Sequence, residues 1–314
     1  MSESLKGVLA MVAACVIWGL SPLFYKLLEH VPPLEILAHR TLWSFLIFGA
    51  LLLLQGRLGA LLRALRSWRV LLLVGLAAGM ISLNWFFFIL SIQVGRTVEA
   101  SLGYYIFPLV AVILGRLFFG EALDRVQWLA VALTALAVSV LTAGLGAAPW
   151  IALLLGFSFG LYGVVKKALE MGPIMSVTGE VLLLLPLALL WLWGVNMQGW
   201  VGVTGRPGGH FGESWGDSLL LAFSGAMTAG PLILFSHAAR RLNYASVGLI
   251  QYLNPSLQFA VAVLVFREFF SLWHGIAFAL IWLALGLYSA RALALERSRS
   301  RRAASSGRDV ITHM

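Results

Sequence analysis

Ten apolar stretches, each about long enough to cross a lipid bilayer, constrain the fold more than any other feature of this sequence. The hydrocarbon core of a bilayer is about 30 Å thick, so a spanning helix needs roughly 20 apolar residues. Strands of a membrane barrel would alternate apolar and polar residues, and these stretches do not. The sequence therefore predicts an all-α integral membrane protein with ten transmembrane helices, approximately at Leu5–Tyr25, Leu34–Leu54, Val70–Ile92, Val98–Phe119, Val126–Leu145, Trp150–Val165, Ile174–Trp193, Ser218–Ala238, Ala245–Phe266 and Leu272–Ala290.

The composition excludes a soluble protein. Of the 314 residues, 61% are hydrophobic and 11% are charged, whereas a soluble domain is about half apolar and about a quarter charged. The single cysteine, Cys15, rules out an intramolecular disulfide. Because the first apolar stretch continues well past Cys15, we interpret it as an uncleaved helix rather than a signal peptide.

Basic residues gather in loops that ten spans place on one side of the membrane. Lys and Arg in short loops favour the cytoplasm, so both termini are predicted to be cytoplasmic. The net charge of +9 reflects this side preference, and nucleic-acid binding is not expected. Residues 291–314 form a basic tail that we expect to be disordered and to contact anionic lipid headgroups. The basic loop residues are Arg57, Arg63, Arg66, Arg69, Lys166, Lys167, Arg240 and Arg241.

One pattern occurs twice, 147 residues apart. The first copy, LGYYIFPLVAVILGRLFFGE, begins at Leu102, and the second, LIQYLNPSLQFAVAVLVFRE, begins at Leu249. With an offset of 141 residues, the first span matches the sixth at Gly19 and Gly160, Lys26 and Lys167, Glu29 and Glu170, and Pro32 and Pro173. The change from 141 to 147 indicates an insertion of about six residues in the loop before the eighth span.

The repeat predicts two five-helix units, residues 1–145 and residues 146–290. Five is an odd number, so the second unit must enter the membrane upside down. Inverted repeats are a common plan of secondary transporters, and they place the binding site near the midplane between the two units.

Four segments carry a family resemblance: EILAHRTLWSF from Glu35, VEASLGYY from Val98, GPLILFSHAARRL from Gly230 and GLIQYLNP from Gly248. In this order and spacing the chain resembles the RarD branch of the EamA-type drug/metabolite transporters, from Lys6 to Tyr288. The resemblance implies ten helices, a bacterial inner-membrane location and movement of small molecules, often discussed in connection with chloramphenicol sensitivity. It does not name the cargo. Phe107 departs from the expected Asn before the proline, which the second unit keeps as Asn254.

Polar residues and prolines inside a span are candidate functional features, because both are costly in lipid. Pro108 and Pro255 lie near the middle of spans four and nine, where a proline removes a helix hydrogen bond. We expect helix breaks there that line a wet cavity. The predicted cargo-binding residues beside them are Tyr104, Tyr105, Gln251, Tyr252 and Asn254. The alternative is that the prolines only bend the helices and the tyrosines only pack.

Further candidate cargo contacts are Asn84 and Trp85 in span three, Trp18 in span one and Tyr162 in span six. An amide can bond to cargo, and an aromatic face can stack on a flat or cationic ligand. Two alternatives remain. Asn84 bonds to a neighbouring helix, or the aromatic residues belong to belts at the membrane interface.

Ionisable residues in spans two and seven predict gates and proton coupling. Glu35 and His39 share a helix face, Arg40 follows them, and Glu180 is the counterpart of His39 in the second unit. Because the units are inverted, His39 and Glu180 should lie on opposite sides of the midplane. His titrates near neutral pH, so His39 or a buried Glu180 could carry a coupling proton. The alternative is structural: His39 and Arg40 reach the headgroups or pair with Glu35.

Two other patterns predict architecture. The GxxxG motifs that begin at Gly75 and Gly156 allow close helix approach. Glu121 and Glu268 are expected to pair locally or to cap the next helix. The chain has no phosphate-binding loop, no HExxH motif, no cysteine pair and no GxSxG elbow, so an enzyme, a metal site or a cofactor is not expected.

The sequence thus predicts a secondary active transporter (permease) that exports a small amphipathic organic molecule, drug or metabolite, with proton coupling. Its expected partners are the cargo, membrane lipid and protons, and a homodimer is compatible with the sequence. The alternative from another class is a non-transporting membrane receptor or assembly scaffold.

Overall fold

The fold, seen in a computed structural model, is a bundle of membrane-length helices. The structure describes residues 3–242 and 244–312, and within them it contains no β-strand. Ten segments in the described part of the chain are long and apolar enough to cross a membrane, which confirms the predicted spans. The elements are α1 (Glu3–Leu27), α2 (Pro33–Leu54), α3 (Leu58–Ala64), α4 (Trp68–Gln93), α5 (Thr97–Phe119), α6 (Arg125–Leu145), α7 (Trp150–Ala168), α8 (Pro173–Gln198), α9 (Trp215–Ala239), α10 (Tyr244–Gln251), α11 (Leu253–Ala260), the π-helix η1 (Val261–Val265) and α12 (Leu272–Thr312).

Large apolar side chains lie exposed around the bundle. Examples are Leu72, Trp128, Leu136, Leu187 and Leu190. A monomer in water rarely exposes contiguous apolar surface on this scale. Lipid is the solvent in which such a surface is stable, because it satisfies apolar side chains without ordering water.

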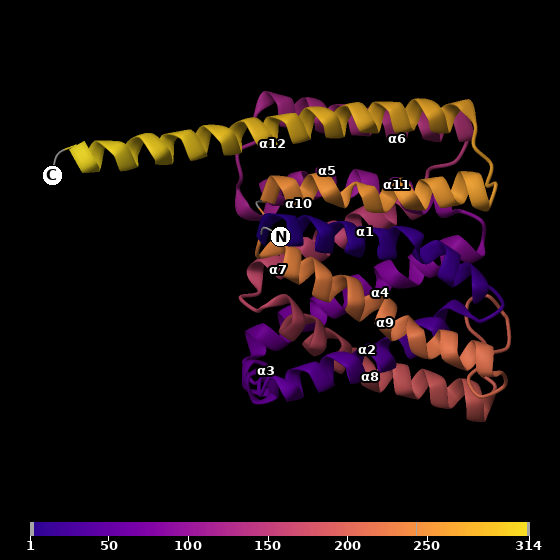
Figure 1. The fold of residues 1–314 in the computed structure, drawn as a ribbon. Coiled ribbons are helices and arrows are strands. Elements are labelled where there is room, and N and C mark those ends of the chain that lie inside the picture. Colours follow the sequence, from indigo (N-terminus) through magenta and orange to yellow (C-terminus); the bar gives the residue numbers. More distant parts are fainter. Residues whose placement is uncertain (1–2, 243, 313–314) are drawn as a thin grey trace.

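The two ends of the bundle can be told apart by the chain segments that they carry (Figure 1). At one end α1 begins at Glu3, α7 connects to α8, and α12 runs outward. We call this end the terminal face. The opposite end carries residues 199–214, the long connection between α8 and α9, and we call it the loop face. The tail was expected to be disordered, whereas its described backbone continues α12 to Thr312. Its Ala, Arg and Glu residues are good helix formers.

The halves α1–α6 and α7–α12 pack reciprocally. Helix α5 packs on α7 as α11 packs on α1, α4 packs on α7 as α9 packs on α1, and α6 packs on α12. The same reciprocity appears at single residues. A Cβ on Gly19 would lie 2.7 Å from Leu257, and a Cβ on Gly160, its repeat counterpart, would lie 3.0 Å from Val110. Val110 is the counterpart of Leu257 at the offset of 147, so two copies of one contact join the halves.

The two midspan prolines have different effects. Helix α10 ends at Gln251, four residues before Pro255, and α11 restarts the span at Leu253. This is the break that the missing N–H of a proline favours. The break predicted at Pro108 is wrong, because α5 runs through it as one helix. Close packing alone does not explain the difference. A Cβ on Gly103 would lie 2.8 Å from the Ala152 carbonyl oxygen of α7, and a Cβ on Gly19 of α1 would lie 3.0 Å from the Asn254 carbonyl oxygen at the break.

The two GxxxG motifs also differ. Gly156 and Gly160 face α5, where added Cβ atoms would lie 3.0 Å from side chains, so the packing prediction is confirmed there. Gly75 and Gly79 have no such neighbour within 4 Å, and the packing prediction is wrong for them. The spacing of small residues does not reveal which face of a helix meets a partner.

Glu121 and Glu268 make contacts that are distant in sequence rather than local. The Glu268 carboxylate accepts the N–H groups of Thr97 and Val98 at 2.8 Å, capping the start of α5. Glu121 instead pairs with Lys167 of the second half. The first N–H groups of a helix lack partners within the helix, so Glu268 meets a need that α5 cannot meet itself.

Candidate functional site

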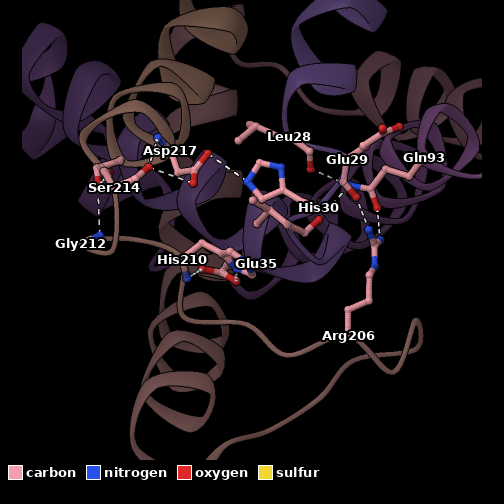
Figure 2. Close-up of polar contacts among 12 residues, drawn as sticks. Leu28, Glu29, His30, Glu35, Gln93, Arg206, His210, Gly212, Ser214 and Asp217 are labelled. Carbon is pink, nitrogen blue, oxygen red and sulfur yellow. Dashed lines mark hydrogen bonds and ion pairs between the residues drawn. The ribbon is translucent and has the colours of Figure 1, made fainter.

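Glu35 is a carboxylate bound by the opposite half of the protein. It lies in the first turn of α2 at the loop face and is 0% exposed. The N–H groups of Gly209 and His210 donate to it at 3.0 and 2.8 Å, and His210 Nδ1 lies 3.2 Å from it (Figure 2). A Cβ on Gly208 would lie 2.8 Å from Glu35 Oε2, so glycine is needed for this approach. The loop before α9 therefore folds into the bundle and binds the first half through Glu35.

Other polar contacts close the same face. They join the α1–α2 connection and the end of α4 to the long loop and the start of α9 (Figure 2). The contacts are Arg206 with the Glu29 carbonyl oxygen and with Gln93, Gln93 with the carbonyl oxygens of Leu28 and Val31, and His30 with Asp217. Four chain segments from both halves thus meet at the loop face.

His39 is buried one turn below Glu35 without a hydrogen bond. Its side chain is 4% exposed, and neither ring nitrogen has a partner among the described residues. The ring stacks on Phe211 of the long loop at a centroid distance of 4.8 Å. His39 and Glu35 do not form the hydrogen-bonded pair of the structural alternative. The N–H groups of the loop bind the Glu35 carboxylate instead. His39 therefore contacts the loop by stacking and keeps both nitrogens free.

Arg40 points into the bundle rather than toward headgroups. Its side chain is 5% exposed, so the alternative in which it reaches the membrane surface is wrong. Its Nε donates to Thr228 Oγ1 of α9 at 2.7 Å, and its Nη1 donates to the Tyr25 hydroxyl of α1 at 2.6 Å. Its guanidinium carbon lies 4.0 Å from the centre of the Trp85 ring of α4. Arg40 therefore joins four helices through neutral groups.

A run of aromatic rings leads from Arg40 toward the terminal face. Successive ring centres lie 6.0, 5.7, 5.9 and 5.8 Å apart. Asn84 supports this run, because it accepts from Tyr104 at 2.9 Å and donates to the Leu155 carbonyl oxygen and to Ser158 at 3.0 Å. The rings, which we call the aromatic run, belong to Tyr25, Phe88, Tyr104, Phe159 and Tyr162.

Glu180 lies at the terminal-face end of the aromatic run. It is 1% exposed and bonds to Lys166 Nζ at 2.7 Å. The hydroxyls of Ser176 and Tyr162 donate to it at 2.8 and 3.1 Å. Every one of these partners belongs to α7 or α8, so the terminal-face carboxylate is bound within its own half.

The remaining predicted residues do not lie on the aromatic run. Tyr105 and Tyr252 line a separate cavity of about 540 Å³ between α5, α10–α11 and α12, where the Tyr105 hydroxyl lies 2.6 Å from Ser256. Adjacent residues of a helix point about 100° apart, so Tyr104 and Tyr105 face different spaces. Trp18 contacts Phe235 of α9, Asn254 accepts from Gln258, and Gln251 has no hydrogen bond within the described residues.

Comparison with known proteins identifies the family. The model of the EamA-like transporter family matches residues 5–143. Protein RarD of Streptomyces exfoliatus is 42% identical over 301 residues, which cover 96% of this chain and 93% of that protein. This chain belongs to the RarD branch of the EamA-like transporter family. It is a multi-pass bacterial membrane transporter.

Other relatives of this RarD-branch transporter agree. A Bacillus subtilis protein named uncharacterized transporter YojE is 41% identical, covering 92% of this chain and 95% of that protein. A Pseudomonas aeruginosa protein named chloramphenicol-sensitive protein RarD is 32% identical, covering 95% and 98%. A crystal structure with 20% identity matches 91% of this chain and 97% of its own with a TM-score of 0.59, which supports the fold alone.

Several site residues of this RarD-branch transporter escaped the sequence prediction. Lys166 was counted as a loop cation, yet it lies inside α7 and neutralises Glu180. His210, Phe211 and Arg206 belong to the loop that carries the predicted insertion. The insertion and the glycines around His210 were the available signal, since extra length beside an inverted repeat gives one half a segment that the other lacks.

Proposed function

We propose that this chain is a secondary active transporter that exports a small amphipathic organic molecule, a drug or metabolite, in exchange for protons. Its location is the bacterial inner membrane, with both termini and the terminal face in the cytoplasm. The cargo lies along the aromatic run, on Tyr104, Tyr162 and Trp85, while Asn84 holds Tyr104 in place through its own hydrogen bonds to α7. Amphipathic cargo suits these residues because the rings supply apolar area and their hydroxyls supply polar contacts.

The observation that carries the proposal is the pair of buried carboxylates, Glu35 and Glu180, at opposite ends of the aromatic run. Each accepts hydrogen bonds or an ion pair that need a deprotonated carboxylate. Protonation of either carboxylate removes a buried charge and weakens those bonds. Proton binding can therefore shift the protein from one conformation to another. An ionisable group inside a membrane bundle is costly, and such groups mark proton and substrate paths in membrane proteins.

The proposed cycle uses the two faces in turn. In the closed loop face, Glu35 binds the long loop and joins the halves. A proton that reaches Glu35 or His39 from outside releases the loop and opens that face, and the proton leaves through Glu180 when the terminal face opens. The units 1–145 and 146–290 exchange shapes in this cycle, as inverted repeats do. Reporter tags beside Glu121 and Glu268 test the inversion, because they should respond from opposite compartments.

Flux in sealed vesicles tests transport directly. Purified protein in vesicles with an imposed pH difference should move at least one member of a broad panel of drugs and metabolites against its gradient. Glu35→Gln, His39→Gln and Glu180→Gln should each abolish the dependence on the pH difference while the protein still folds. The matched control is Glu170→Gln, which replaces an exposed acid in the connection between α7 and α8 and should behave as wild type.

Two results would contradict the proposal in different parts. If no member of the panel moves, a membrane receptor or assembly scaffold becomes the better reading. If cargo moves but all three variants keep their full response to the pH difference, export stands and the proton role of these residues is rejected.

A further inference from the structure

The guanidinium of Arg40 is a buried charge without a counter-ion. Its two hydrogen bonds go to hydroxyls, and its closest ring partner, Trp85, is neutral. Within the described residues no carboxylate forms an ion pair with it, and its Nη2 nitrogen has no hydrogen-bond partner. Burying an ionised group is costly unless it is paired and fully hydrogen-bonded. An uncompensated arginine inside a transporter therefore calls for a second charge that the chain does not supply.

The buried acids of the described chain are all engaged elsewhere. Glu35 binds the backbone of the long loop, Glu180 binds Lys166, and Glu99 pairs with Arg96 at 3.1 Å. Glu35 is the nearest of them in sequence, yet it lies five positions before Arg40 in α2 and so points elsewhere around the helix. His39, the adjacent titratable group, cannot supply negative charge. The missing anion must therefore come from outside the chain.

We propose that the cargo is an organic anion whose carboxylate or phosphate group binds Arg40, with its apolar part on Trp85 and the aromatic run. This assignment rests on the proposed transport function and narrows its substrate class. The planar guanidinium offers a fork of donors that matches both oxyanions. Its hydrogen bonds to Tyr25 and Thr228 fix the orientation of this group. The free Nη2 edge is the part left for the ligand.

The location of Arg40 fits a cargo site rather than a structural ion. It comes from α2 and contacts α1, α4 and α9, so it lies where both halves meet. Its partner Tyr25 begins the aromatic run, and Tyr25 occupies the position that Lys166 occupies in the second half, by the offset of 141. Each half thus places one cation at its end of the run. Lys166 is neutralised by Glu180, and Arg40 is not.

Matched ligands test the charge preference. Thermal unfolding of the full-length protein in detergent is measured with three pairs of probes: benzoate and benzamide, 3-phenylpropanoate and 3-phenylpropanamide, and phenyl phosphate and phenol, with 3-phenylpropylammonium as the cationic member. A ligand that binds only the folded state raises the melting temperature by mass action. At least one anion should stabilise the wild type, and its neutral and cationic relatives should not.

Variants locate the effect at Arg40. Arg40→Gln should weaken binding of the stabilising anion by about 30-fold or more, the loss typical of removing one partner of a buried charge pair. Arg40→Lys keeps the charge without the fork and should retain anion preference with weaker binding, so the test survives if Arg40→Gln does not fold. Arg96→Gln is the matched control, because Arg96 has its own acid partner, and it should bind the anion as wild type does.

The outcomes separate the two proposals. The anion assignment is overturned if no anion in the panel raises the melting temperature of the wild type more than it raises that of the Arg40→Gln variant. It is also overturned if the amides and the ammonium bind as well as the anions. Flux of a neutral or cationic probe in vesicles would then leave the transporter standing. An anion that binds through Arg40 but never crosses the vesicle membrane supports the site and overturns transport instead.

Discussion

The two buried carboxylates at the ends of the bundle are bound in different ways. Glu35 takes its hydrogen bonds from backbone N–H groups that lie 174 and 175 residues later, in the opposite half. Glu180 takes an ion pair and two hydroxyl bonds from α7 and α8, within its own half. The fold repeats, yet one acid joins the halves and the other does not. Protonating Glu35 therefore changes how the halves are connected, whereas protonating Glu180 first changes only its own pair of helices.

The contacts between halves follow the same division. At the loop face they include a fully buried carboxylate, Glu35, and backbone donors, which do not rotate away. At the terminal face the ion pairs that cross between halves, within the described residues, are Lys167 with Glu121, Arg241 with Glu3 and Arg291 with Asp124. These side chains are partly or largely exposed, and ion pairs near the surface contribute little to stability. The loop face thus joins the halves through a buried carboxylate, whereas the terminal face joins them through ion pairs nearer the surface.

The largest expected effect is on the terminal-face acid. Lys166→Met leaves Glu180 buried without a cation, and we expect a loss of about 3–5 kcal/mol in the free energy of unfolding. The double variant Lys166→Met/Glu180→Leu should recover most of that loss, because it removes both charges. Equilibrium unfolding in detergent micelles measures both. Lys167→Met, at the exposed neighbour, should cost less than about 1 kcal/mol. A double variant as unstable as the single one would show that the pair is not the source.

The next effect is on the approach of the long loop to Glu35. In Gly208→Ala the added Cβ would lie 2.5 Å from Val195 and 2.8 Å from Glu35, so the loop must shift. Overpacking of this kind typically costs about 1–3 kcal/mol. With Cys15 replaced by serine, His39→Cys should react faster with a water-soluble thiol reagent when the loop is displaced. Gly216→Ala, at the start of α9, meets only ordinary contacts and should leave the reaction rate unchanged.

A third comparison separates the backbone of the loop from its side chain. In Glu35→Gln one of the two N–H groups bonds to a neutral amide oxygen and the other faces an NH₂ group that cannot accept its hydrogen, which should cost about 1–3 kcal/mol. His210→Ala keeps both N–H bonds and should cost less. Unfolding free energies in detergent decide the order. If His210→Ala is the more damaging variant, the imidazole and not the backbone holds the loop in place.

The smallest effect is expected at Asp124, which lies outside the spans and caps α6. The hydrogen bond from Arg291 holds the pKa of Asp124 below its usual value. Its stabilising contribution is therefore present above the unfolded pKa of about 3.9 and is lost as the pH falls through the lowered folded pKa. Asp124→Asn keeps the cap and should remove this acid dependence of the melting temperature. Glu213→Gln, an exposed loop acid, should leave the acid dependence as in wild type.

Most of the fold could be predicted because span length is a local property. Each apolar stretch had to form a helix by itself, and the repeat spacing predicted where one five-helix half ends and the next begins. Pro108 shows the limit of this reasoning: α5 runs through it as one helix, whereas the span that contains its counterpart Pro255 is interrupted. Gly75 and Gly156 carry the same motif, yet only Gly156 meets a partner helix.

The candidate site was predicted less well, for a related reason. Glu35, Arg40 and Glu180 could be picked out because ionisable residues in lipid are rare. Their partners could not, since the N–H groups of residues 209 and 210 are present in any sequence. Tyr104 and Tyr105 look equivalent in the sequence, and only the rotation of α5 sends one to the aromatic run and the other to a separate cavity.

The sequence by itself determined that this is a membrane protein with ten spans and a repeated five-helix unit, because hydrophobic length and repeat spacing depend on no distant contact. Only the tertiary structure decided which half closes which face and that Arg40 has no counter-ion. Both depend on which groups meet across the bundle, and the chain order does not specify those distances.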